Sequence, residues 1–164
     1  MARARTCISF AVMFAAAVLA PWPAAAEMRF HYDCHVTGVR QVPQMGREGQ
    51  PAELRHFTCR ISGGLLDGFT ATGTNLLEHH QEGARLVGST VMARKKNAIL
   101  VYEVNDARRR LRQSEDGAVQ WESTGTGIYK HATGSVASLA GKSFTALVQS
   151  TGCQTFTIDS VVGD

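Results

Sequence analysis

The chain has 164 residues, with 17 Lys and Arg against 14 Asp and Glu, and a formal net charge of +3. This length suits one domain with a core of its own, so folding requires neither a metal nor a dense set of disulfides. The charge is far below that of a strongly basic nucleic-acid binder, which argues against that class.

The N-terminus has the order of a secretory signal peptide. Two arginines precede an uncharged apolar run over residues 6–20, and an A-x-A site ends at Ala26. A membrane helix needs roughly 20 apolar residues, and this run is shorter and is followed by prolines. We therefore predict cleavage after Ala26, with residues 1–26 as the signal peptide. Residues 27–164 are then one exported domain, periplasmic or secreted, with a net charge of +1 because 15 basic and all 14 acidic side chains remain.

The exported part reads as short alternating runs, which predict half-buried strands. In residues 28–36 one face is apolar: Phe30, Tyr32, Cys34 and Val36. In residues 53–61 we expect Phe57, Cys59 and Ile61 on one face and Arg55 on the other. Similar runs follow at residues 68–78, 84–94, 98–104, 107–113, 118–124, 142–150 and 154–162.

Turn residues separate these runs at nearly regular intervals, which is typical of an all-β barrel or sandwich. We predict a small antiparallel β-barrel of about eight strands, because closure removes exposed strand edges. Residues 39–52 are expected to form the one long polar loop.

Three cysteines remain after cleavage, and an oxidising compartment should bridge one pair. Cys34 and Cys59 lie on the apolar faces of the first two strands, so they are the favoured disulfide if those strands pair. Cys34 with Cys153 is the competing pair, because the last strand of a barrel can close against the first.

Two histidine clusters are candidate reactive sites. His31, Asp33 and His35 share a strand face, but positions i and i+4 lie roughly 13 Å apart, so both histidines reach one ion only across a bulge. We predict no metal site and no cofactor. Glu78 and His79 have the chemistry of a base and its orienting group. Without a nucleophile nearby, a polar hairpin tip is the favoured interpretation.

The segment 107–113 is rich in arginine. Alternation places Arg108, Arg110 and Arg112 on one face, where guanidinium groups can bind phosphate or carboxylate. A charged strand that resists edge pairing is the favoured alternative.

Four aromatic residues are candidates for lining a pocket: Tyr32, Tyr102, Trp121 and Tyr129. Glu103 is a further polar candidate. Barrels of this size either hold one small ligand or are filled by their own side chains. No G-x-S-x-G, H-E-x-x-H or C-x-x-C motif occurs, so the sequence leans away from an enzyme.

The stretch GTGIYKHATG, residues 125–134, fits neither a Walker loop nor a dinucleotide fingerprint. It resembles the G-T-G-x-[YF]-x-x-[AI]-x-G signature of the allene oxide cyclase and dirigent type β-barrel superfamily, which includes secreted bacterial proteins. The match covers about residues 121–145, and His131 departs from it, since a small residue often stands there. The glycines are expected to bend the chain at a barrel corner, with Thr133 and Gly134 starting the next strand.

The resemblance implies a barrel with an apolar mouth or cavity. Plant members bind reactive apolar molecules and guide ring closure or radical coupling; none of their active-site residues can be assigned here. The main hypothesis is non-catalytic binding of a small apolar ligand, with no stable membrane span. One alternative is an isomerase or cyclase that acts on a lipid-derived substrate and uses Tyr32, Tyr102 or Glu103. The other is an envelope surface protein that binds anionic partners through residues 108–112.

Overall fold

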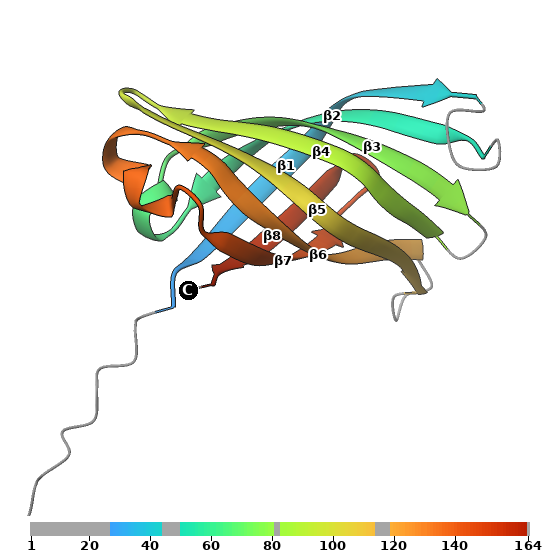
Figure 1. Cartoon of the computed structure of the whole chain (residues 1–164). Coiled ribbons are helices and arrows are strands. Elements are labelled where there is room, and N and C mark those ends of the chain that lie inside the picture. The colour runs from blue at the N-terminus through green and yellow to red at the C-terminus, as the bar shows by residue number, and fades with distance from the viewer. Residues whose placement is uncertain (1–26, 44–49, 81–82, 114–118, 164) are drawn as a thin grey trace, which may run out of the picture.

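The computed structural model describes residues 27–43, 50–80, 83–113 and 119–163. They form a closed barrel of eight antiparallel strands in chain order, which confirms the predicted fold class (Figure 1). The strands are β1 (Arg29–Val42), β2 (Ala52–Ser62), β3 (Thr70–His80), β4 (Gly83–Lys95), β5 (Ala98–Gln113), β6 (Val119–Ala132), β7 (Ser143–Ser150) and β8 (Thr155–Val162). β8 closes the barrel against β1, from Arg29 opposite Val161 to His35 opposite Thr155.

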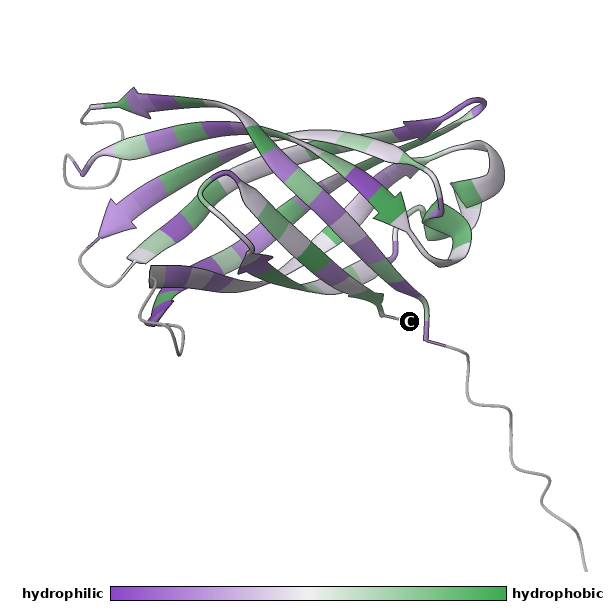
Figure 2. Cartoon of the chain, turned by 180° about the vertical axis from the view of Figure 1, so that it is seen from behind, coloured by the Kyte–Doolittle hydropathy of each residue, from purple (hydrophilic) through white to green (hydrophobic). Residues whose placement is uncertain are grey.

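The alternation seen in the sequence becomes an inner and an outer face. Hydrophobic and hydrophilic residues follow one another along the strands (Figure 2). On β1 the inward row includes Phe30, Tyr32 and Cys34, all buried. This two-residue period lets each strand bury one face against the barrel interior.

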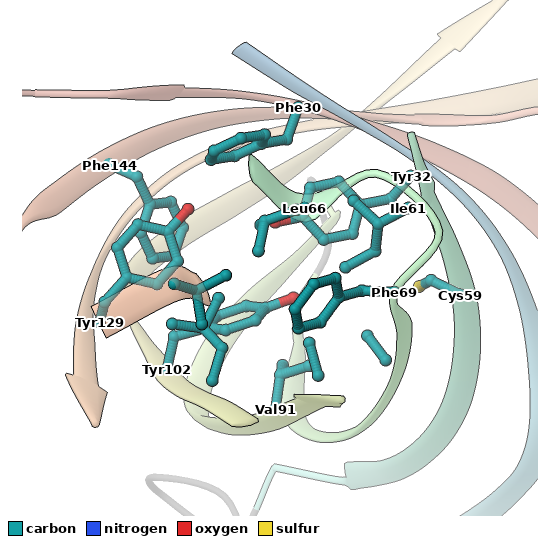
Figure 3. Packing of buried hydrophobic residues seen from close by; sticks show 14 of the residues in the cluster. Phe30, Tyr32, Cys59, Ile61, Leu66, Phe69, Val91, Tyr102, Tyr129 and Phe144 are labelled. Atoms are coloured by element: carbon teal, nitrogen blue, oxygen red, sulfur yellow. The ribbon is translucent and has the colours of Figure 1, made fainter. Parts of the chain in front are cut away.

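Two short 3-10 helices close one end of the barrel. They are η2 (Gly64–Leu66) and η3 (Gly134–Leu139), and they lie side by side at that end (Figure 1). Three of their side chains, Leu66, Val136 and Leu139, are completely buried. Rings from separate strands surround Leu66, as Figure 3 shows for Phe30, Tyr129 and Phe144. This half of the barrel is therefore a packed core.

The predicted strand limits need three corrections. β1 continues to Val42 and pairs with Ala52, so most of the described part of the expected 39–52 loop is strand; residues 44–49 lie outside the described residues. The runs 98–104 and 107–113 are one strand, because a bulge at Asn105 absorbs the polar Asn-Asp pair without breaking β5. The stretch 118–124 likewise continues through the glycine motif as β6.

The glycine motif acts mainly within a strand. A Cβ on Gly127 would clash with the Phe144 ring and with the Glu103 carbonyl oxygen, so glycine here lets an aromatic side chain cross the strand. Gly134 has a positive φ of 63° and begins η3, not the next strand as the sequence suggested. The corner is at Gly134, and the earlier glycines serve packing.

A disulfide joins Cys34 on β1 to Cys59 on β2, where the two residues are direct partners. This confirms the favoured pair, and Cys153 is free and exposed. The bond is consistent with an oxidising compartment. The described residues contain no helix with the length and hydrophobicity that a bilayer span requires. The predicted signal peptide lies outside them.

Candidate functional site

The half of the barrel away from η2 and η3 contains a cavity of about 80 Å³, with side chains from all eight strands along its walls. Most of the wall is apolar: Phe57, Leu77, Leu86, Val91, Val104, Phe144, Val148, Phe156 and Ile158. A concave apolar space with a few polar groups is the usual form of a small-molecule site.

Tyrosine side chains lie at the inner end of the cavity. Tyr32 and Tyr102 line it. Tyr129 packs behind them, with its ring edge to face against the Tyr102 ring and the two ring centres 5.7 Å apart. Burial raises the pKa of all three above the ordinary value, well above it for Tyr102. Contacts with Ser160 and Tyr129 partly offset the rise at Tyr32. At neutral pH these hydroxyls are therefore uncharged and can donate hydrogen bonds.

Two of the polar atoms beside this tyrosine cluster have no good partner. The Tyr129 hydroxyl and the Ser160 Oγ are buried, and neither makes a hydrogen bond of acceptable geometry with any described residue. Both nevertheless lie close enough to Tyr32 to offset part of the effect of burial on its pKa. Neither residue lines the cavity, so these atoms belong to the packed half of the barrel.

A buried ion pair lies at the end of the cavity away from the tyrosines, which we call the outer end. Arg55 Nε donates to Glu53 Oε1 at 2.8 Å, and the two side chains are only 15% and 8% exposed. Gln41 also donates to Glu53, and His79 Nε2 lies 3.4 Å from its Oε2 without hydrogen-bond geometry. Burial alone would raise the pKa of Glu53, but the charge and hydrogen bond of Arg55, with smaller contributions from His79 and Arg109, lower it.

Arg109 is the second cation at this end, and it is placed differently. Its guanidinium lies 4.2 Å from the centre of the Trp121 ring, a cation–π contact. Its Nε is buried without a partner, and among the described residues its side chain makes no hydrogen bond or close ion pair. Burial, with the nearby charge of Arg55, lowers the pKa of Arg109 to about 10, so it remains a cation at neutral pH.

Facing bulges direct Arg109 inward. β4 has a bulge at Val87, and β5 has a bulge at Asn105. Arg85 is paired with Arg108 and Val91 with Tyr102, but the described residues of β4 and β5 between these two pairs are not direct partners. Each bulge shifts the alternation by one residue. Val104, Ala107 and Arg109 therefore line the cavity in succession on β5.

The sequence-predicted pocket residues fall in three places. Tyr32, Tyr102 and Trp121 line the cavity, and Tyr129 lies in the packed half. Glu103 does not line the cavity; on the outer face its Oε2 lies 3.3 Å from Lys130 Nζ.

The other predicted clusters do not join the cavity as groups. His31 Nδ1 lies 2.6 Å from Asp159 Oδ1 on the outside, and chiefly this hydrogen bond raises the pKa of His31 against the effect of burial. Within the described ranges no three His, Cys, Asp or Glu side chains are grouped to hold a metal ion. Glu78 accepts a hydrogen bond from Arg85, not from His79.

The predicted row of arginines is exposed on the outer face, as alternation indicated. One of its members, Arg112, donates to Glu122 at 2.7 Å, so part of its charge is neutralised. Arg109, which the sequence reasoning passed over between them, is the arginine that enters the cavity.

Two functional candidates were missed from the sequence. Arg55 was expected opposite Phe57, yet both line the cavity, since positions two apart on a strand share a face. Arg109 was missed although the alternation that places Arg108, Arg110 and Arg112 outside places it on the opposite face, with Ala107.

No protein-family model, curated protein or solved structure matches this chain.

Proposed function

We propose that this protein is a non-catalytic binding protein that holds a small apolar ligand in the open half of its barrel. The cavity supports this most directly, because its aromatic and aliphatic walls enclose space that the side chains do not fill. Burial of apolar ligand surface there supplies the binding free energy, at about 25 cal/mol per Å². The packed half of the barrel holds the walls rigid, which limits the entropy lost on binding.

We also propose a superfamily and a cellular location for this protein. The signature around residues 125–134 supports membership of the allene oxide cyclase and dirigent type superfamily. The signal-like N-terminus and the Cys34–Cys59 disulfide support export to the periplasm or beyond.

One observation favours a catalytic alternative. Tyr32 and Tyr102 are among the residues that line the cavity, and burial keeps their hydroxyls uncharged at neutral pH. Such donors can protonate or polarise an oxygen of a lipid-derived substrate during isomerisation or cyclisation. Under this alternative Tyr102→Phe would retain ligand affinity and lose turnover of that substrate, as product analysis by chromatography would show.

Calorimetry with 1-octanol tests the binding proposal. We expect saturable binding, and a loss of it in Ala146→Phe, because Ala146 lines the cavity and the ring would fill it. Thr145→Phe is the matched control, since Thr145 is the exposed neighbour on the same strand. Absence of binding to the wild type, or equal effects of the two variants, would contradict the proposal.

A further inference from the structure

We infer that the ligand of this cavity is amphipathic, with a carboxylate that Arg109 binds at the outer end and an apolar body that lies along the barrel. The inference rests on the proposed binding function, and it adds the chemical class of the ligand. Three features of the outer end carry it: charge balance, the unused hydrogen bonds of Arg109, and the distance to the inner end.

The charges at the outer end do not balance. Arg55 and Arg109 are two cations whose charges act on the carboxylate of Glu53, while the buried Glu78 nearby pairs with Arg85. Glu53 is already engaged by Arg55 and Gln41. One positive charge is left over, and it belongs to Arg109. A desolvated cation without a counterion is unfavourable, so an anion bound beside it would be stabilised strongly.

Arg109 also has unused donors. Its guanidinium carries five N–H groups in a planar fork, which matches the two oxygens of a carboxylate. The Trp121 ring supports one face of the guanidinium at 4.2 Å, so the fork is held in place by packing. The inward-facing position of Arg109 on β5 turns these donors toward the cavity and not toward the outer surface. Little side-chain entropy would then be lost on binding.

The spacing along β5 sets the form of the ligand. Arg109 follows Tyr102 by seven residues, or roughly 20 Å of strand, and apolar side chains line most of the wall between them. A molecule with its carboxylate at Arg109 would place its apolar part against Val104 and Val148. A carboxylic acid with an apolar chain combines these two features, and a medium-chain acid would cover the part of the wall next to Arg109, whereas a small inorganic anion would leave the apolar wall uncovered.

Octanoate and 1-octanol form a matched pair of probes, because they share a chain and differ in the charged group. Calorimetry at neutral pH would compare both ligands on the wild type, Arg109→Met and Arg108→Met. Methionine retains apolar packing over Trp121, and Arg108 is the adjacent exposed arginine whose loss changes the net charge equally. Circular dichroism would establish that each variant folds.

We expect the wild type to bind octanoate roughly 10- to 100-fold more tightly than 1-octanol, as a charge-assisted hydrogen bond implies. Arg109→Met should lose this preference and still bind 1-octanol, while Arg108→Met keeps it. Added salt should weaken octanoate more than 1-octanol. If Arg109→Met does not fold, the wild-type preference and its salt dependence still decide the matter.

Failure would take two distinguishable forms. If 1-octanol binds the wild type as tightly as octanoate, or if both arginine variants reduce the preference equally, the carboxylate inference is wrong and the binding proposal stands. If neither ligand binds, the binding proposal is wrong and the inference is lost with it.

Discussion

Arg109 rests its guanidinium 4.2 Å from the centre of the Trp121 ring, at the outer end of a cavity that both residues line. The contact joins a cation on β5 to an aromatic face on β6. It retains the arginine inside the barrel although the Nε finds no partner among the described residues. This pair marks the boundary between the apolar interior and the charged outer end, where Arg55 and Glu53 also lie.

The three tyrosines of the chain are all buried, and burial raises the pKa of each. Spectrophotometric titration should therefore show no tyrosinate until the protein unfolds. In the unfolded chain the tyrosines lose their protons near pH 10, so the free energy of unfolding should fall as the pH rises above that value. Tyrosinate absorbance with an ordinary midpoint in protein that circular dichroism shows to be folded would contradict the packing described here.

Acid should destabilise the outer end through Glu53. Its folded-state pKa is lowered, so the stability that it contributes is present above the unfolded value of 4.5 and is lost as the pH falls through the lower, folded value. Glu53→Gln should reduce the free energy of unfolding at neutral pH by roughly 1–3 kcal/mol. It should also flatten the loss below pH 4.5, as urea unfolding at several pH values would measure. Glu103→Gln, in an exposed pair with Lys130, should leave that acid dependence unchanged.

Gly127→Ala should destabilise the barrel, because the added Cβ meets the Phe144 ring and a backbone oxygen of β5 that cannot move alone. We expect a loss of roughly 1–3 kcal/mol by urea unfolding, the range for overpacking. Gly88→Ala is the control, because no atom lies within 4 Å of its added Cβ. Equal effects of the two substitutions would show that the close approach of Phe144 does not require glycine.

The disulfide should contribute to stability through the unfolded state. Its cysteines are 25 residues apart in sequence, and closing a loop of that size is worth about 2–4 kcal/mol in the chain-entropy account. Replacing Cys34 and Cys59 together by alanine should lower the free energy of unfolding by this amount, whereas Cys153→Ser should have little effect. Peptide mass mapping that found Cys153 in the native disulfide would contradict the assignment.

Much of the fold followed from local pattern. The alternation of Phe30, Tyr32 and Cys34 predicted an inward row, and the disulfide followed once the first two strands were expected to pair. The bulge at Asn105 was not predictable in the same way. Polar residues between two apolar runs look like a turn, and only the pairing of β5 with β6 on either side shows that the strand continues.

The candidate site was predicted in part, for the same reason. Tyr32, Tyr102 and Trp121 were expected to line a pocket, because aromatic residues in strands with alternating apolar and polar positions usually face the interior of the barrel. Glu103 stands between Tyr102 and Val104, so alternation alone places it on the outer face. The bulge at Asn105 comes later, and because of it Val104, Ala107 and Arg109 all line the cavity. Within a regular strand, the sequence shows which side chains share a face. The position of a bulge depends on how the strand pairs with neighbouring strands, whose residues are distant in the chain.

The most direct test of the central claim is the location of a bound ligand by nuclear magnetic resonance. Backbone amide shifts would be followed while 1-octanol is added to the oxidised protein. We expect saturable shifts at cavity residues on separate strands, including Tyr102, Trp121 and Phe144, with little change at outward residues such as Met92 and Ile99. Shifts confined to the outer face, or no saturable shifts at any concentration below aggregation of the ligand, would contradict the claim that this barrel is a binding site.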